Sequence, residues 1–478
     1  MNETKASNVS LTKNNRRNIG PVSVKDMLAT GGLLLLPFLF GMNIITIGIF
    51  ASRKVVNGVI AQPSSIGAGH SGEIVKLAET AAWKYIVCGL FFGALLFSLA
   101  LFIAGAFKKS AYPWFKPLFV ASALLMAGGN TLSVLTGSKL VLIGARVVIG
   151  LGVGILCSLC NAYYAAILGK DRGNLVGVFH GLMITIGVFS SGQLVGMLGE
   201  EHNTWIFGII TVISLVSAGL SFFFVKAIPE PKPVSVESID SNELPEMEMR
   251  ATGSLSTDRP LRTAQPAQSN TEHQEVALII LACLGIHVIQ QVSGINPILS
   301  ESDLIFGGPA EAATKWSKVF FNCAGGLGSV LLMIIMRINP ALFKYTVLTS
   351  SFGAGLAYVP LVLGMKQLGE WCAGLYVALF SMGLASLPWM LPSMILTNQM
   401  YISFASGLGP LANWLMSCVL LFEYRHMHEV IGSKVFIAGM LACFLGGVLG
   451  LLLLIKAEKV QKDKALLTSS NEEEKLFI

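Results

Sequence analysis

The chain has 478 residues, of which 53% are hydrophobic and only 13% charged, and its net charge is +6. This balance excludes an ordinary soluble protein, in which about 25% of residues are charged, because most of this chain needs an apolar solvent. The positive charge does not indicate nucleic-acid binding, since the basic residues are spread among connecting segments. We therefore expect an integral membrane protein that contacts the lipid bilayer and has no nucleic-acid partner.

Apolar stretches of about 20 residues or more recur along the chain, and each is long enough to cross a membrane as a helix. Their unbroken apolar runs exclude membrane-spanning strands, which alternate polar and apolar side chains. The predicted fold class is an all-α membrane protein with twelve transmembrane helices. In chain order they cover residues 28–50, 84–107, 117–137, 140–168, 174–198, 204–226, 276–297, 317–337, 345–366, 371–396, 405–424 and 432–456.

A long polar stretch, residues 228–275, divides these helices six and six. It predicts two six-helix bundles, residues 28–227 and 276–456, joined by a linker. Polar tails, residues 1–27 and 457–478, flank the bundles, and we expect the second tail to be disordered. Lys and Arg are more frequent in the connectors that share a side with both tails, so both termini and the linker are predicted to be cytoplasmic. No removable signal peptide is expected, because the first apolar segment is too long and lacks a small-residue cleavage site.

The seventh predicted helix carries three amide side chains, Gln290, Gln291 and Asn296, within an apolar sequence. An unpaired amide in hydrocarbon costs several kcal/mol, so these groups need partners from other helices, from water or from a ligand. On a straight helix Gln291 and Asn296 lie about 140° apart, and both face one cavity only if the helix is broken between them. Gly294 and Pro297 permit such a break, because proline removes a backbone hydrogen bond. Contacts between helices would satisfy the same amides, so this pattern alone leaves both interpretations open.

This segment also resembles a motif of the sugar porters, the family of the facilitative glucose transporters in the major facilitator superfamily. Residues 290–296 read Gln-Gln-Val-Ser-Gly-Ile-Asn and match every fixed position of the family motif Q-Q-x-S-G-I-N. The likeness continues, in the family's order, at residues 40–43, 144–150, 172–173, 322, 388–389 and 413–414.

The resemblance implies the major facilitator fold, in which two bundles rock about a central site, and a small hexose as substrate. By this resemblance the substrate-binding residues are Gln290, Gln291, Asn296, Asn322 and Trp389. Gating or conformational roles are assigned to Asn43, Arg146, Gly294, Pro388, Asn413 and Trp414.

Several residues typical of the family are missing. Acidic residues expected at the cytoplasmic ends of the fourth and tenth helices align with Ala165 and Met394, and the basic motif after the second helix is reduced to residues 107–109. In the family such charges close the cytoplasmic side, so their loss predicts relatively more populated inward-facing states. Within the site, a sugar-binding glutamine of the fifth helix aligns with Gly181 and a glutamate of the tenth with Ser381.

The predicted function is facilitated diffusion of a hexose by alternating access, with no cofactor, in the plasma membrane by default. An enzyme is not expected, because His180 and His287 lie in predicted helices without an acidic partner, and Cys157 and Cys160 form a single C-x-x-C pair without further metal ligands. Two alternatives remain open, a proton-coupled sugar symporter and a sugar sensor that barely transports. Asn43 stands where symporters of the family carry an aspartate, and an amide cannot carry the proton. Neither the sugar nor the oligomeric state follows from the sequence.

Overall fold

The structure is a computed structural model. It describes residues 22–46, 50, 54–56, 59–60, 74–77, 80–107, 111–202, 204–228, 267–300, 315–365, 368–396 and 398–476. Most of these residues are helical, because long runs of apolar residues satisfy their backbone hydrogen bonds within one segment.

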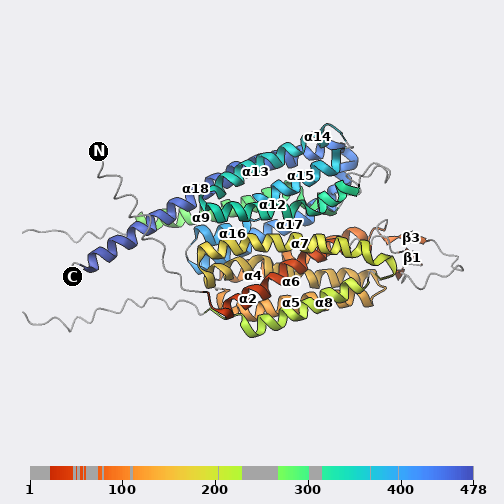
Figure 1. Ribbon diagram of the computed structural model, residues 1–478, viewed down its shortest axis with the longest axis horizontal. Coiled ribbons are helices and arrows are strands. Elements are labelled where there is room, and N and C mark those ends of the chain that lie inside the picture. Colours follow the sequence, from red (N-terminus) through yellow and green to blue (C-terminus); the bar gives the residue numbers. More distant parts are fainter. Residues whose placement is uncertain are drawn as a thin grey trace, which may run out of the picture.

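The first half of the chain forms one helical bundle, which occupies the lower part of Figure 1. Most of its helices consist of apolar residues and carry few charges, and each is long enough to cross a membrane. Its helices are α2 (Val24–Ile45), α4 (Trp83–Ala106), α5 (Phe115–Leu135), α6 (Lys139–Leu168), α7 (Lys170–His202) and α8 (Thr204–Phe224), with a short 3-10 helix, η3 (Tyr112–Trp114), before α5.

The second half forms the bundle in the upper part of Figure 1, and three of its spans are divided into two helices. The divided spans are α9 (Ala267–Val292) with α10 (Ile295–Ser300), α13 (Phe343–Ala357) with α14 (Val359–Val362), and α15 (Gly369–Met382) with α16 (Leu387–Ile395). The others are α12 (Lys315–Ile338), α17 (Gln399–Ile431) and α18 (Val435–Leu476), with the short 3-10 helices η4 (Pro340–Leu342) and η6 (Gly432–Lys434).

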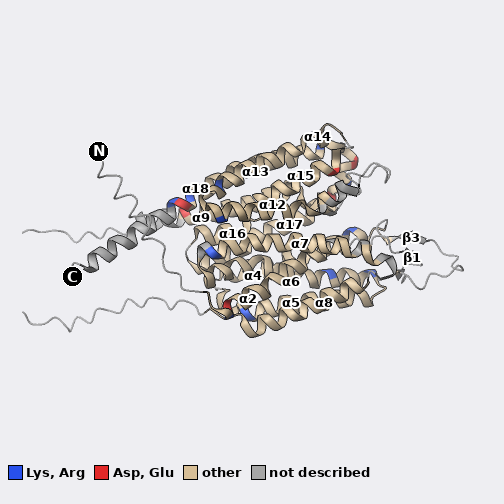
Figure 2. Cartoon of the chain, in the orientation of Figure 1, with Lys and Arg blue, Asp and Glu red and all other residues tan. Residues whose placement is uncertain are grey.

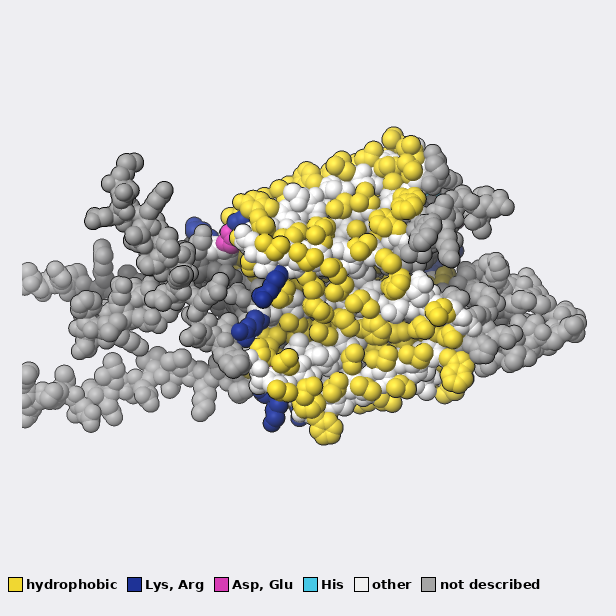
Figure 3. All heavy atoms as spheres, in the orientation of Figure 1, with side chains coloured by type: hydrophobic (Ala, Val, Ile, Leu, Met, Phe, Trp, Pro, Cys, Tyr) yellow, Lys and Arg dark blue, Asp and Glu magenta, His cyan; other side chains and the backbone are white. Residues whose placement is uncertain are grey.

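Ten segments of the described chain are long and apolar enough to cross a membrane, and one of them, Gln399–Lys459, contains α17 and the first part of α18. The described apolar part of α12, Cys323–Ile338, is shorter but belongs to a helix that begins at Lys315. Taken together, these segments agree with the twelve predicted transmembrane helices. Figure 3 shows hydrophobic side chains covering the face between the two ends of the bundles, as expected for a surface in contact with lipid.

A three-stranded antiparallel sheet between α2 and α4 was not among the predicted elements. Its strands are β1 (Lys54–Val56), β2 (Val59–Ile60) and β3 (Ile74–Lys76), in the order β2-β1-β3. Ile60 is buried, and its backbone N–H donates to the carbonyl of Gly137 between α5 and α6 at 2.9 Å. Two- and three-residue strands give too short a pattern for sequence analysis to detect. We call this end of the molecule the sheet side and the opposite end, where α2 begins, the tail side (Figure 1).

Helices extend further into two predicted polar segments than expected. Helix α9 begins at Ala267, inside the predicted linker 228–275, and α18 continues to Leu476, through the tail 457–478 that was expected to be disordered. The expectation for the C-terminal tail was therefore wrong. Its residues are rich in Ala, Leu, Glu, Lys and Gln, which have high helix propensity, and they continue a helix that is already formed.

Three ion pairs between described residues lie on the tail side, and each joins segments of the same bundle (Figure 2). The pairs are Lys226–Asp26 (2.7 Å), Lys344–Glu458 (2.6 Å) and Lys456–Glu275 (3.6 Å). These pairs support the individual bundles rather than the contact between them.

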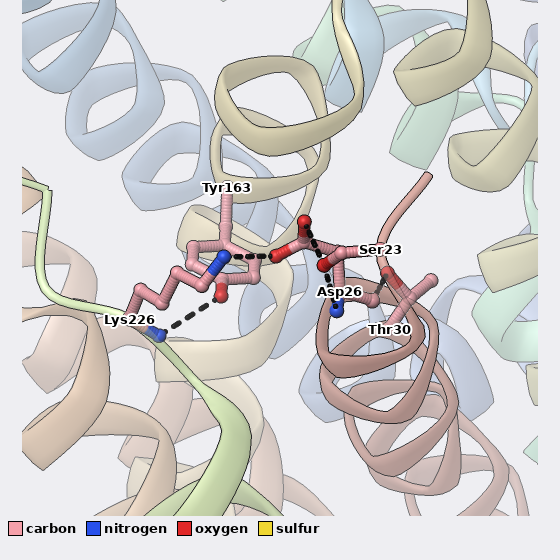
Figure 4. A network of polar contacts seen from close by, with 5 residues as sticks. All are labelled: Ser23, Asp26, Thr30, Tyr163 and Lys226. Atoms are coloured by element: carbon pink, nitrogen blue, oxygen red, sulfur yellow. Dashed lines mark hydrogen bonds and ion pairs between the residues drawn. The ribbon is translucent and has the colours of Figure 1, made fainter. Parts of the chain in front are cut away.

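The pair Lys226–Asp26 belongs to a network that joins three segments of the first bundle (Figure 4). Ser23 caps α2 by accepting the backbone N–H of Asp26 at 3.1 Å and donates its hydroxyl to the Asp26 carboxylate at 2.6 Å. The backbone N–H of Lys226, just after α8, donates to the hydroxyl of Tyr163 of α6 at 3.1 Å. The network therefore fixes the tail-side ends of α2, α6 and α8 to one another.

Apolar contacts join the two bundles on the tail side, between α4 and α17. The rings of Phe102 and Phe404 lie 5.1 Å apart. A Cβ atom added to Gly407 would lie 2.6 Å from the backbone nitrogen of Phe102, and one added to Gly105 would lie 2.9 Å from the Cα atom of Phe404. The two helices therefore touch backbone to backbone through glycine, and we call these four residues the glycine latch.

Candidate functional site

A central cavity of about 160 Å³ lies between the two bundles. Helices of both halves line it, α2, α6 and α7 from the first and α9, α10, α12, α15, α16 and α17 from the second. Its polar side chains are mostly neutral amides and hydroxyls, because charged groups are rare within the spans. The cavity therefore suits a small, uncharged, polar molecule.

The helix break between α9 and α10 is one boundary of this cavity. Gly294 adopts φ +90°, a conformation that favours glycine, and Pro297 lacks the N–H that would otherwise bond to the carbonyl of Ser293. Two hydroxyls satisfy this carbonyl instead, from Tyr358 next to α14 and from Tyr376 of α15, the latter at 3.0 Å. The break predicted from Gly294 and Pro297 is present, and hydrogen bonds from other helices to the Ser293 carbonyl stabilise it.

A second break, between α15 and α16, supplies backbone acceptors to the cavity. The carbonyls of Leu384 and Ala385 accept hydrogen bonds from the Gln290 amide at 2.8 and 3.0 Å. Pro388 occupies the first turn of α16, where its missing N–H costs nothing, so the chain is interrupted before this proline rather than bent at it. The two broken helices thus bind each other through Gln290.

The predicted amides form one connected network. The side chain of Asn413, in α17, donates to Gln290 Oε1 at 2.6 Å and accepts from Gln291 Nε2 at 3.1 Å. The side-chain amide of Asn296 donates to Gln291 Oε1 at 2.6 Å and to the Ser417 hydroxyl at 3.0 Å. Gln290, Gln291, Asn296 and Asn413 all line the cavity. The break at Gly294 is what brings Gln291 and Asn296 within hydrogen-bonding distance.

Aromatic rings form an apolar wall beside these amides. The rings of Trp389 and Trp414 lie 5.6 Å apart, and both line the cavity together with Phe40. His287 stands edge-on to Trp389 at 4.8 Å. The Nε1 atom of Trp414 is buried and has no hydrogen-bond partner. Such flat surfaces next to hydrogen-bonding groups suit a ring that has apolar faces and polar edges.

The remaining predicted residues lie outside the described lining. Asn322 belongs to α12, but its side chain lies outside the part of the chain that the structure describes. Asn43 is fully buried and donates to the carbonyl of Leu39 at 2.8 Å. Arg146 donates to the carbonyl of Asn43 at 2.9 Å, which joins α6 to α2. These two residues contact each other and do not line the cavity, and the conformational role assigned to them stays a prediction.

Sequence analysis missed the groups that hold the site in place. Tyr358, Tyr376 and the carbonyls of Leu384 and Ala385 come from segments with no distinctive motif, and only their contacts reveal their roles. A tyrosine within an apolar span does carry a signal, because its hydroxyl needs a partner there. Among the described residues, no group of three or more His, Cys, Asp and Glu side chains could hold a metal ion.

Comparison with known proteins identifies related sequences. The family model for "Sugar (and other) transporter" matches residues 32–461. The chain is 23% identical over 326 residues to "Hexose transporter 1" of Plasmodium knowlesi, a match that covers 58% of this chain and 62% of that protein. It is 23% identical over 360 residues to the mouse "Solute carrier family 2, facilitated glucose transporter member 2", covering 67% of each. A 311-residue match to the "High glucose sensor RGT2" of Saccharomyces cerevisiae is 24% identical and covers 59% of this chain and 37% of that one.

Solved structures show the same fold. The proton:xylose symporter XylE of the major facilitator superfamily, bound to 6-bromo-6-deoxy-D-glucose, superposes with a TM-score of 0.62 at 15% identity, over 91% of this chain and 95% of that one. The inward-open XylE of E. coli gives a TM-score of 0.55 at 16% identity, over 89% and 94%. Both the two-bundle fold and the resemblance to sugar porters are thus confirmed. The chain is an integral membrane protein that belongs to the sugar (and other) transporter family, and it has the fold of the major facilitator superfamily.

Proposed function

We propose that this protein carries a hexose across the membrane by facilitated diffusion, with the central cavity as its binding site. The observation that carries the proposal is the network of neutral amides next to two tryptophans. A hexose has several hydroxyls that donate and accept hydrogen bonds, and amides do both without a charge. The names of the relatives, which are hexose and glucose transporters, support the same substrate class.

The hydrogen bonds suggest different tasks for the amides. Both N–H groups of Gln290 are occupied by Leu384 and Ala385, and its oxygen accepts from Asn413, so Gln290 positions the other residues. One N–H of the Gln291 side chain has no partner among the described residues. The side-chain oxygen of Asn296 has none there either. These two amides are therefore the proposed direct contacts of the sugar, with Trp389 beneath its ring and Asn322 a further candidate.

Uniport is preferred to proton symport. Arg146 contacts the backbone carbonyl of Asn43, and the neutral Asn43 side chain cannot take up and release a proton. Symport is the main alternative, because the superposed XylE structures are of a proton symporter. A sugar sensor is the third possibility, supported by the match to the yeast glucose sensor.

The orientation in the membrane is part of the proposal. We place the tail side in the cytoplasm, because Lys and Arg gather at that edge of the apolar surface (Figure 3). Helices α2 and α9 begin, and helix α8 ends, on this same side (Figure 1). The plasma membrane is the proposed location.

Reconstitution of the purified protein in liposomes tests these proposals. Uptake of labelled D-glucose down its gradient, unchanged by a pH gradient or a protonophore, is expected for a uniporter. Accumulation driven by the pH gradient would support symport, and saturable binding without uptake would support a sensor.

A variant pair locates the site. Gln291→Leu should abolish saturable uptake, because an apolar side chain cannot pair with a hydroxyl. Gln193→Leu makes the same chemical change in α7 at a residue that does not line the cavity, and it should transport normally. Equal transport by both variants would show that the sugar binds elsewhere.

A further inference from the structure

The first bundle contributes polar side chains to the cavity that the amide network does not use. These side chains are Asn161 of α6 and His180 and Thr185 of α7, and all three line the cavity. The hydroxyl of Thr185 donates to the carbonyl of Gly181 at 3.1 Å. Asn161 Oδ1 and His180 Nδ1, in contrast, have no hydrogen-bond partner. Both residues are more than nine-tenths buried, with exposed fractions of 7% and 6%.

Buried polar atoms without a partner are uncommon in folded proteins, and each is unfavourable until something pairs with it. Other such atoms occur in this protein, for example Asn130 Oδ1 in α5, but Asn130 does not line the cavity. Asn161 and His180, like Trp414 with its Nε1 atom, differ from Asn130 in lying at the wall of the cavity, where a bound molecule can supply the missing partner. Asn161 and His180 are the residues of the first bundle with this property.

The packing of α6 against α7 keeps these two side chains together. A Cβ atom added to Gly177 would lie 2.9 Å from Asn161 Oδ1, so the absence of a side chain there makes room for the amide. Gly177 and His180 are three residues apart on α7 and share one face of the helix. Asn161 Oδ1 therefore lies at the same face of α7 as His180.

We propose that Asn161 and His180 are the substrate contacts of the first bundle and set which hydroxyl of the sugar is required. A sugar hydroxyl donates to Asn161 Oδ1, and the same or a neighbouring hydroxyl pairs with His180 Nδ1. The ligand class is a neutral pyranose with an unsubstituted hydroxyl at that position. This inference rests on the proposed function, and it makes the sugar a bridge between the two bundles.

The test uses the full-length protein in liposomes, with labelled D-glucose exchange competed by unlabelled D-glucose and by its 1-, 2-, 3- and 6-deoxy derivatives. For the wild-type protein, one derivative should compete about tenfold more weakly than D-glucose, the effect of one lost hydrogen bond. In the Asn161→Leu or His180→Phe variant, the affinity for D-glucose should itself fall about tenfold. The affinity for the same deoxy derivative should not fall below its wild-type value. Such non-additivity identifies a contact between the side chain and that hydroxyl.

Stability measurements separate this role from a structural one. Asn161→Leu removes a buried unpaired atom, so the melting temperature without sugar should not fall. The matched variant Asn130→Leu changes a buried asparagine away from the cavity and should leave competition by every sugar unchanged. If both cavity variants bound D-glucose with wild-type affinity, or if each deoxy derivative lost affinity equally in them, the roles of Asn161 and His180 would be overturned but the proposed function would stand. No competition by any hexose in the wild-type protein would overturn the proposed function as well.

Discussion

Substitution of Gly407 by alanine should weaken the closure of the tail side. The new Cβ atom would lie 2.6 Å from the backbone nitrogen and 2.9 Å from the Cα atom of Phe102. Backbone atoms cannot rotate away, and carbon atoms normally stay about 3.5–4.0 Å apart, so α4 and α17 must separate by about 1 Å. Overpacking of this kind destabilises the packed arrangement of α4 and α17 by about 1–3 kcal/mol.

If the clash exists only while the tail side is closed, this cost shifts the ratio of closed to open states by about 5- to 150-fold. The gain in helix propensity on replacing glycine is shared by both states and does not affect the ratio. The matched control is Gly128→Ala in α5, where nothing lies within 4 Å of the added atom.

A cysteine placed at Ser386, which lines the cavity, reports the opening in a background without the native cysteines. A membrane-impermeant thiol reagent applied from the tail side should label Gly407→Ala several-fold faster than the unsubstituted background, and Gly128→Ala at an unchanged rate. Equal labelling of all three would refute the view that the glycine latch closes this side. This view modifies the expectation from the missing charges, since apolar contacts, rather than ion pairs between bundles, join the described tail-side ends of α4 and α17. The relative population of inward-facing states stays a prediction.

Three further predictions concern the site. Gly294→Ala should destabilise the protein more than Gly364→Ala does in a thermal-melting assay: both glycines have positive φ, but only at Gly294 would the new atom meet the Tyr358 hydroxyl, at 2.9 Å. Tyr376→Phe removes one of two donors to the Ser293 carbonyl, so it should lower sugar affinity about two- to tenfold in the exchange assay with little loss of expression, and unchanged affinity would show that the tyrosine only fills space. Asn43→Asp places a carboxylate on the residue whose backbone carbonyl binds Arg146. Uptake that becomes sensitive to a pH gradient is expected, whereas uptake that stays indifferent would show that this residue alone does not confer coupling.

The sequence by itself determined the membrane class and the helices, because hydrophobic length is a property of each segment alone. It also predicted the break in the seventh helix, since Gly294 and Pro297 act on their own backbone. The amides Gln290, Gln291 and Asn296 could be recognised as groups that need partners, because they are polar side chains within an apolar run. The small sheet and the helical C-terminal tail escaped prediction, the first because its strands are too short and the second because polarity was taken to outweigh helix propensity.

Only the tertiary structure decided how these groups are used. Asn413 lies more than 120 residues from Gln290 and Gln291 in the chain, yet it bonds to both. Tyr376 likewise lies 83 residues from Ser293 and donates to its carbonyl. Which helix faces which is set by the packing of side chains across the whole bundle, and no local pattern encodes it. The sequence therefore specified which polar groups need partners, and the packing of the two bundles decided which partners they have.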